Sequence, residues 1–256
     1  MNAAVLRQAT ILDVINRDGG ARTTDLGHRL GVSRVTARRD IEALAGRGLV
    51  SRVRGGAIAL TRGPGPAGRR DGGRRREKLA IARVAAGLAR AGQAVGVLAG
   101  TTTALLAAAL REVPGLTVVT NSIRVADVFH DDARPDRTVV LIGGTRTASG
   151  ALVGPVAQHT AAGINLDLLF LGAHGMTARA GFTTPDPAEA RTHGLLLRAA
   201  RRVVVLADHT KWGVTGVATI APLAAADVLV SDEGLGRTAR AALRGHVGEL
   251  RLAAPG

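Results

Sequence analysis

The chain has 256 residues, a formal net charge of +14 and no cysteine. Without cysteine it can form neither disulfides nor thiolate metal sites, and a reducing compartment fits this composition. It has no run of about 18 uncharged apolar residues, and its N-terminus lacks a basic region followed by an apolar one. We therefore expect a soluble, cytoplasmic protein with no membrane partner, long enough for one large core and a smaller module.

The positive charge is concentrated near the N-terminus. Residues 1–78 contain 17 Lys and Arg against 7 Asp and Glu, a net of +10, whereas residues 79–256 contain 17 against 13, a net of +4. A bias toward arginine in the genome would explain why Lys78 and Lys211 are the only lysines. It would not explain the asymmetry, so we expect the N-terminal part to bind nucleic acid.

The first 60 residues have the pattern of three helices and a hairpin. Residues 4–17 place Val5, Ile11, Leu12 and Ile15 near helical spacing, and "DGG" ends this helix. In "TTDLGHRLG", residues 23–31, threonine and aspartate can start a short second helix and glycine can end it.

A third helix is predicted to start at Ser33, a good N-cap, with Val35, Ile41 and Leu44 as its apolar stripe. In residues 48–60, "GLVSRVRGGAIAL", apolar and polar residues alternate about a Gly-Gly turn, which predicts a small hairpin. Residues 1–60 are therefore predicted to form a winged helix-turn-helix domain.

This module carries side chains suited to double-stranded DNA. The start of the third helix is the end that enters the major groove, where arginine can bind guanine and threonine can meet a thymine methyl or a phosphate. Each single arginine is also compatible with an ordinary solvated charge. The predicted DNA-binding residues are Ser33, Arg34, Thr36, Arg38, Arg39, Arg52 and Arg54.

Residues 61–76 are dominated by Gly, Pro and Arg, so they are predicted to be a flexible basic linker that precedes an effector domain, residues 77–256. In that domain the short apolar runs "AVGVLA", "LTVVT", "TVVLI", "LDLLFL", "RVVVLA" and "DVLVS" alternate with alanine-rich helical stretches. This alternation predicts an α/β fold, a Rossmann-like and mostly parallel sheet with helices on both faces. Ligands bind at the carboxyl ends of the strands in such sheets.

Small and polar residues follow these strands. In "AGTTTALL", Gly100 lets a backbone approach a ligand, and the following helix start offers free N–H groups and a positive dipole end. The hydroxyls of residues 101–103 add donors suited to phosphate, and we expect one of them to be only an N-cap. Lys211 can meet a phosphate as a point charge, and Asp208 can accept sugar hydroxyls, although a surface Lys-Asp pair has the same appearance.

Other motifs are interpreted as fortuitous. "GLGRTA", residues 234–239, follows a strand and matches a dinucleotide fingerprint, but that fingerprint needs a later acidic residue and a further strand. Only Glu249 is available in the 17 residues that remain, so we treat the match as chance. A P-loop motif is absent, and His174, His193 and His209 lack metal-ligand spacing. We predict no cofactor, no metal site and no catalytic residue.

Taken together, these segments closely resemble the DeoR family of transcriptional regulators, from about residue 5 to about residue 233. The resemblance rests on the ordered blocks "LGVSRVTARRDIEALAGRGLVSRVRGGA", "EKLAIARVAA", "AGTTT", "VVTNSIRVA", "LIGG", "LVGP", "FLGAHGM", "GFTTPDPAEA" and "VVVLADHTKWG". It implies a sensor domain similar in fold to ribose-5-phosphate isomerase that binds a phosphorylated sugar or related metabolite. The implied effector contacts are Gly100, Thr101, Thr102, Thr103, Asn121, Ser122, Gly143, Gly144, Gly172, Gly175, Asp208 and Lys211.

The chain departs from the family pattern at two positions. Leu98 stands where the family usually has aspartate, and His193 where it often has lysine. Because leucine cannot accept hydrogen bonds from sugar hydroxyls, we expect the phosphate cradle to be kept and the sugar-binding part to have changed.

Three functions remain open. The first is a homo-oligomeric repressor of a carbohydrate operon, in which effector and DNA favour different domain arrangements. The second is a constitutive DNA-binding protein whose sensor domain serves only to dimerise. The third is an isomerase-like enzyme, which needs a positioned acid-base group, and Asp208 has no evident partner.

Overall fold

The computed structural model describes residues 3–18, 20–47, 49–53, 55–59, 74–130 and 134–254. The chain divides into two compact units, Met1–Arg62 and Gly63–Gly256, which are treated separately below. Most of the predicted linker lies outside the described residues, and the first helix of the second unit begins at Arg75, within the segment predicted as linker. No helix among the described residues is long and apolar enough to cross a membrane.

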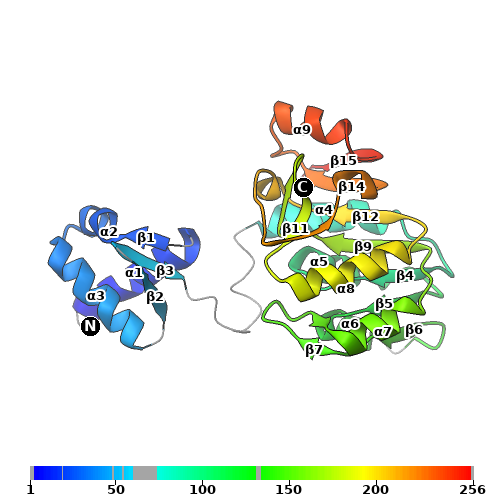
Figure 1. Ribbon diagram of the computed structural model, residues 1–256, viewed down its shortest axis with the longest axis horizontal. Coiled ribbons are helices and arrows are strands. Elements are labelled where there is room, and N and C mark those ends of the chain that lie inside the picture. Colours follow the sequence, from blue (N-terminus) through cyan, green and yellow to red (C-terminus); the bar gives the residue numbers. More distant parts are fainter. Residues whose placement is uncertain are drawn as a thin grey trace. The chain divides into compact units, whose positions relative to one another are not determined.

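The N-terminal unit combines three helices with a small sheet (Figure 1). Its strands pair antiparallel in the order β1-β3-β2. The elements are α1 (Ala3–Asp18), β1 (Gly20–Arg22), α2 (Thr23–Leu30), α3 (Arg34–Gly46), β2 (Val50–Val53) and β3 (Gly56–Ala59).

Apolar side chains from all three helices form one core in this unit. Ile11 and Ile15 of α1, Leu26 of α2, and Ile41 and Leu44 of α3 are buried there. Roughly 25 cal/mol of stabilisation accompanies each Å² of apolar surface removed from water, so this core holds the helices together.

Three details of this unit differ from the sequence-based expectations. Val35 was expected in the apolar stripe of α3, but its side chain is 63% exposed, because it lies one residue into the helix on the face away from Ile41 and Leu44. The turn of the hairpin was expected at Gly55 and Gly56, but Gly56 already belongs to β3 and pairs with Val53. Of the two glycines, only Gly55 has a positive φ, of 88°. The three-residue strand β1 was not predicted.

The second unit is built on a seven-stranded sheet in the order β15-β14-β12-β9-β4-β5-β6, in which every neighbouring pair is parallel. Six of its strands coincide with the predicted apolar runs, and the edge strand β15 was not predicted. The strands are β4 (Ala94–Val97), β5 (Thr117–Thr120), β6 (Thr138–Leu141), β9 (Leu168–Gly172), β12 (Val203–Leu206), β14 (Val228–Asp232) and β15 (Glu249–Ala253).

Helices cover both faces of this sheet, which confirms the predicted fold class (Figure 1). One apolar cluster joins the sheet to α4 (Arg75–Ala86), α5 (Thr101–Leu110) and α6 (Ile123–His130). A second cluster on the opposite face joins it to α7 (Pro155–Ala162), α8 (Pro187–Arg198) and α9 (Arg237–Arg244). Strand side chains alternate between the clusters: Val204 and Leu206 belong to the first, Val203 and Val205 to the second.

Two smaller sheets complete the unit, and neither was predicted. One is antiparallel and contains β10 (Gly175–Thr177), β11 (Gly181–Thr184) and β13 (Ala218–Ala221), and the other pairs β7 (Thr145–Arg146) with β8 (Leu152–Val153). The short 3-10 helices η1 (His209–Lys211) and η2 (Leu223–Ala225) follow β12 and β13.

The dinucleotide-like segment "GLGRTA" connects β14 to α9, and the further strand thought to be missing does exist as β15. Glu249, however, is the first residue of that strand, at the end opposite to the carboxyl edge where a ribose would bind. Its carboxylate instead pairs with Arg251 at 2.8 Å. The structure therefore gives a different reason for rejecting the dinucleotide interpretation.

Candidate functional site

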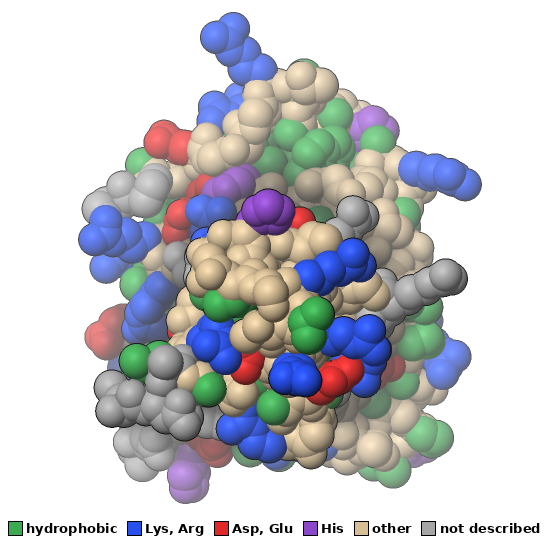
Figure 2. Space-filling model, turned by 90° about the vertical axis from the view of Figure 1, so that its left-hand side faces the viewer, with side chains coloured by type: hydrophobic (Ala, Val, Ile, Leu, Met, Phe, Trp, Pro, Cys, Tyr) green, Lys and Arg blue, Asp and Glu red, His purple; other side chains and the backbone are tan. Residues whose placement is uncertain are grey.

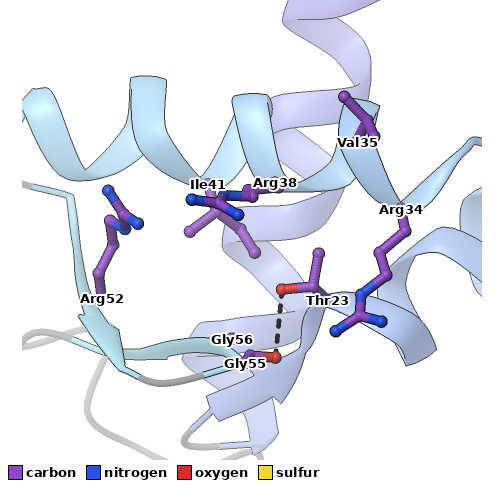
Figure 3. A pocket seen from close by; sticks show the side chains of 8 residues that line it. All are labelled: Thr23, Arg34, Val35, Arg38, Ile41, Arg52, Gly55 and Gly56. Carbon is purple, nitrogen blue, oxygen red and sulfur yellow. Dashed lines mark hydrogen bonds between the residues drawn. The ribbon is translucent and has the colours of Figure 1, made fainter.

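A groove of about 420 Å³ lies between α3 and the β2-β3 hairpin (Figure 3). Arg34 and Arg38 line it from the helix, and Arg52 lines it from β2, so three of the predicted DNA-binding residues surround one space. Thr23 also lines it, and its hydroxyl donates to the carbonyl of Gly55 at 3.1 Å and ties α2 to the hairpin turn.

The arginines of this groove are exposed, and two of them share one carboxylate. Glu42 accepts from Arg38 Nε at 3.2 Å, and Arg52 Nη1 lies 3.4 Å from the same oxygen. Arg39 is also exposed, outside the groove. In Figure 2, basic side chains are spread over the front face, which belongs to the N-terminal unit, and acidic ones are fewer. Exposed pairs of this kind are worth at most about 1 kcal/mol, so a phosphate can compete for these arginines.

Ser33 and Thr36 have a structural task at the start of α3. Ser33 is the N-cap, and its Oγ accepts the amide of Thr36 at 3.1 Å and lies 2.8 Å from the Thr36 hydroxyl. These bonds satisfy a backbone donor that the helix itself leaves free. Arg54, the last predicted DNA-binding residue, lies outside the described residues.

Asp40 fixes the orientation of α3 on α1, and sequence analysis did not single it out. Its carboxylate is buried on the inner side of the helix, where it accepts from Arg7 Nε at 2.5 Å and from Gln8 Nε2 at 2.9 Å. Because Arg7 and Gln8 both belong to α1, the arrangement holds the outer face of α3 in a fixed position.

A second site lies in the other unit, where a pocket of about 190 Å³ opens at the carboxyl ends of β4, β9 and β12. Six of the predicted effector contacts line this pocket: Gly100, Thr101, Thr102, Gly172, Asp208 and Lys211. Residues that sequence analysis did not predict as effector contacts also line it, among them Ser149, His174, Thr184, Glu189 and His193.

Helix α5 begins directly at the pocket, with Gly100 as its N-cap and no side chain capping it. The expectation that one threonine is an N-cap is therefore wrong, since residues 101–103 are the first three helical residues. Thr101 and Thr102 reach the pocket, while Thr103 is fully buried and its hydroxyl has no hydrogen-bond partner among the described residues. The amides of this first turn point along the helix axis toward the pocket end of the sheet.

Asp208 and Lys211 line the pocket from the segment that follows β12. Asp208 is buried and caps η1, with Oδ1 accepting from the amide of Thr210 at 3.1 Å and from the Thr210 hydroxyl. Lys211 is half-buried at the end of the same short helix. The capping turn thus holds a carboxylate and an ammonium group in one wall.

Glu189 is the acidic residue that sequence analysis missed. It lies in the first turn of α8 and is nearly buried. Its carboxylate accepts from the hydroxyls of Thr147 at 2.8 Å, Ser149, and Thr184 at 2.9 Å. Three hydroxyls from two segments, the connection between β7 and β8 and the end of β11, therefore meet on one side chain in the pocket wall. In the sequence, Glu189 is recognisable only as the second acid of "GFTTPDPAEA". Nothing in the local pattern separates it from an ordinary acidic residue in the first turn of a helix.

Two histidines line the pocket, and both are biased toward the neutral form. Burial lowers the pKa of His193 against the opposing effect of Glu189 and Asp186. Burial and the charge of Lys211 lower the pKa of His174, against the opposing effect of Glu189. No group of three or more His, Cys, Asp or Glu among the described residues is arranged to hold a metal ion.

Asn121 and Ser122 do not line the pocket, because their polar groups are used inside the fold. Asn121 is fully buried; its Oδ1 accepts the amide of Ala99 at 2.8 Å, and its Nδ2 donates to the carbonyl of Leu152 at 3.3 Å. Ser122 Oγ accepts the amide of Val125 at 3.3 Å at the start of α6. The structure therefore places both side chains outside the pocket wall.

Gly143, Gly144 and Gly175 also lie outside the pocket wall, and two of them have clear backbone reasons to be glycine. Gly144 has a φ of 112°, and a Cβ there would lie 2.5 Å from the carbonyl oxygen of Val153. A Cβ on Gly175 would lie 2.2 Å from the carbonyl oxygen of Val214. Their role as effector contacts is not supported by this geometry.

Leu98 also lies outside the pocket wall. Its side chain is fully buried in the apolar cluster beside Val119 and Leu169 and does not line the pocket. A leucine there fits the core, and the carboxylates that can accept sugar hydroxyls in the pocket are those of Glu189 and Asp208. That Leu98 changes the sugar-binding part of the site stays a prediction.

Comparison with solved structures finds a partial likeness to ribose 5-phosphate isomerase A from Methanocaldococcus jannaschii. The sequence identity is 17%, the TM-score is 0.38, and 53% of each chain is covered. So slight a likeness has no bearing on function.

Several regulators are similar to this chain over nearly its whole length. GlpR, an HTH-type transcriptional regulator of Haloferax volcanii, is 35% identical over 91% of this chain and 92% of its own. The uncharacterized HTH-type transcriptional regulator FruR of Bacillus subtilis is 32% identical over 88% of this chain and 90% of its own. The glycerol-3-phosphate regulon repressor of Escherichia coli is 28% identical over 88% and 90%.

Two family descriptions match adjoining parts of the chain. Residues 7–62 match the DeoR-like helix-turn-helix domain, and residues 74–233 match the DeoR C terminal sensor domain. The relatives are named as regulators or repressors and not as enzymes. With a helix-turn-helix unit that presents arginines and a second unit with a pocket at the carboxyl edge of its sheet, the chain belongs to the DeoR family of helix-turn-helix transcriptional regulators.

Proposed function

We propose that this protein is a transcriptional repressor of a carbohydrate-metabolism operon, whose binding to operator DNA is weakened by a small phosphorylated sugar or polyol held in the pocket of the second unit. The observation that carries the proposal is the pocket itself. It combines the open start of α5, the ammonium group of Lys211, and the carboxylates of Asp208 and Glu189 at one edge of the sheet.

The charges of the pocket favour a ligand with one phosphate and several hydroxyls. Of the residues that line it, Lys211 is the cationic one, and the first turn of α5 adds N–H donors and a positive dipole end. Glu189 and Asp208 would repel a second anionic group but can accept from hydroxyls. The volume, about 190 Å³, is below the range of pockets for drug-sized ligands and fits a metabolite of a few carbons.

The DNA-binding half of the proposal rests on the exposed face of α3 and on the groove beside it. Arg34, Arg38 and Arg39 project from the first two turns of this helix, and Arg52 lies across the groove on the hairpin. The names of the relatives, which include repressors, support this role. A single module seldom gives sufficient affinity, so the active form is a homo-oligomer on repeated half-sites.

The test of effector binding is thermal unfolding of the full chain with glycerol 3-phosphate, ribose 5-phosphate, fructose 1-phosphate and inorganic phosphate. A ligand of the native state raises the unfolding temperature by mass action. The proposal expects an organic phosphate to raise it in the native chain and to have a much smaller effect on Lys211→Ala. An exposed arginine of the same unit, Arg90, supplies the control variant Arg90→Ala.

If none of these compounds shifts the unfolding temperature while the chain still prefers its own promoter DNA over random DNA, the second candidate is favoured. In that case the protein is a constitutive DNA-binding regulator and its sensor domain is a dimerisation scaffold. Absence of any preference for promoter DNA at physiological salt contradicts both candidates.

A further inference from the structure

His193 is the most buried titratable side chain that the pocket wall draws from α8, and its contacts determine where its proton lies. It is 3% exposed and lines the pocket together with Glu189 of the same helix. Its Nε2 lies 3.3 Å from Nδ2 of Asn121, and its Nδ1 is buried with no hydrogen-bond partner in the part of the chain that the structure describes.

The amide of Asn121 can have only one orientation. Its other terminal atom lies 2.8 Å from the backbone nitrogen of Ala99. A backbone N–H is always a donor, so the atom facing it must be the carbonyl oxygen Oδ1. The NH2 group then faces the carbonyl of Leu152 and the ring of His193, and it can only donate to both.

This orientation selects one tautomer of His193. A nitrogen that receives a hydrogen bond from Asn121 carries no proton, so Nε2 is the acceptor and the ring proton of the neutral form lies on Nδ1. A doubly protonated ring would place two donors against each other at Asn121. The effect of burial on the pKa of His193 acts in the same direction.

The remaining Nδ1–H is a buried donor without a hydrogen-bond acceptor among the described residues. Buried donors are paired in the great majority of cases, and an unpaired one is costly because it has lost its contact with water. Within the part of the chain that the structure describes, the ring lines the same pocket as the start of α5 and Lys211. A ligand acceptor that reaches Nδ1 from that pocket would satisfy the donor.

We propose that His193 is a specificity-determining residue of the effector pocket: fixed by Asn121 as a neutral Nδ1–H donor, it binds an oxygen acceptor of the phosphorylated sugar or polyol. The inference rests on the effector binding proposed above. Since the donor is uncharged, it adds affinity for a hydroxyl, carbonyl or phosphate oxygen without adding to the positive charge of Lys211. Asn121 acts here as a positioning residue, through the imidazole.

The tautomer can be observed directly in the full chain labelled with 15N-histidine. At neutral pH, two-dimensional NMR of the imidazole nitrogens should show His193 with a protonated Nδ1 and an unprotonated Nε2. Asn121→Leu removes the hydrogen bond that selects this form, and the variant should show a mixture of tautomers. A proton on Nε2, or on both nitrogens, in the native chain overturns the inference.

The effect on ligand binding is tested with two substitutions that each keep one end of the imidazole. His193→Gln retains an acceptor near the position of Nε2 and loses the Nδ1 donor, whereas His193→Asn retains a donor near the position of Nδ1. Titration with the phosphate compound that most stabilises the native chain should give a dissociation constant raised about tenfold for His193→Gln. The constant for His193→Asn should stay closer to that of the native chain. His159, which is exposed on α7, gives the control His159→Gln.

The possible outcomes separate this inference from the function on which it rests. If a phosphate compound binds the native chain and His193→Gln equally well, His193 does not contact the ligand and the inference fails while the proposed function stands. If His193→Asn is the weaker of the two variants, the inference also fails. If none of the compounds binds the native chain, effector binding fails and the inference fails with it.

Discussion

At the scale of single residues, Arg38 and Arg52 both pair with one carboxylate, that of Glu42. Glu42 pairs with both, at 3.2 and 3.4 Å, although all three side chains are exposed. Pairs of this kind contribute little to stability. If these arginines bind DNA as proposed, Glu42 competes with the phosphate or guanine for their N–H donors.

Substitutions at this cluster should change DNA affinity in opposite directions. Arg38→Ala should weaken binding by about 1–3 kcal/mol if it reads a base, or lower the slope of log affinity against log salt by about one if it binds a phosphate. Glu42→Gln should strengthen binding, since it frees both arginines and removes a negative charge. Fluorescence anisotropy with promoter DNA at several salt concentrations measures both effects. Equal affinities for Arg38→Ala, Arg90→Ala and the native chain would contradict the assignment.

His193 gives the second unit a pH-dependent stability. Its pKa lies below the ordinary value of 6.5 in the folded chain because of burial, so the unfolded chain binds the proton more readily. The free energy of unfolding should be unaffected by His193 above about pH 6.5 and should decrease as the pH falls through the interval between the two pKa values. Urea unfolding from pH 7.5 to 5 should show a smaller decrease for His193→Gln. An identical slope would mean that His193 is not the responsible group.

At the scale of elements, the long and strongly patterned segments were predictable and the short ones were not. Apolar runs of five or six residues, such as "RVVVLA", identified six of the seven parallel strands, because strands covered on both faces are apolar throughout. The edge strand β15, "ELRLA", alternates charge with leucine. Strands β1 and β10 have three residues each, too few for a periodic signal.

The candidate sites were predictable to a similar degree. Ligands of parallel sheets bind at the carboxyl ends of the strands. The pocket is lined by three residues that closely follow predicted strands, Gly100, Asp208 and Lys211, as this principle predicts. Glu189 and His193 come from α8, and Ser149 comes from the segment between β7 and β8. Their convergence depends on tertiary packing that no local pattern encodes. Val35 was misassigned because the first turn of α3 projects beyond the core.

The N-cap of α3 provides a test that separates helix stability from DNA contact. Ser33→Ala removes the bond to the Thr36 amide and should destabilise the N-terminal unit by about 1 kcal/mol. Ser33→Asp preserves a capping oxygen and should restore stability, but its negative charge next to the DNA should weaken binding. Calorimetry measures the stability of each variant, and fluorescence anisotropy measures its affinity for promoter DNA. Normal DNA binding by a stable Ser33→Asp variant would show that this end of α3 lies away from the phosphates.

The turn at Gly144 should prove structural. Gly144→Ala combines a φ of 112° with a Cβ placed 2.5 Å from the Val153 carbonyl oxygen. The free energy of unfolding of the second unit should therefore fall by more than 1 kcal/mol, on the order of 2–3 kcal/mol. Gly150 has a φ of 90°, and no neighbouring atom lies within 4 Å of the position that a Cβ would take there, which makes Gly150→Ala the control for φ strain alone. Chemical denaturation measures both, and equal losses would contradict a role for the Val153 contact.

At the scale of the whole molecule, the two units have separate cores and separate tasks. Most of the net charge lies in residues 1–78, with the DNA-binding face, while the pocket belongs to the other unit. A repressor built in this way needs a coupling free energy between the two sites. By linkage, a ligand that weakens DNA binding must itself bind more weakly to the DNA complex, by the same factor.

The central claim is that the pocket and the DNA face are coupled, and one measurement tests it most directly. Promoter DNA is titrated with the full chain at physiological salt, with and without the phosphate compound that raises its unfolding temperature. The account predicts that the compound lowers the affinity for promoter DNA by about 5- to 150-fold, and that Lys211→Ala abolishes this effect. An affinity that is unchanged at saturating ligand would contradict it.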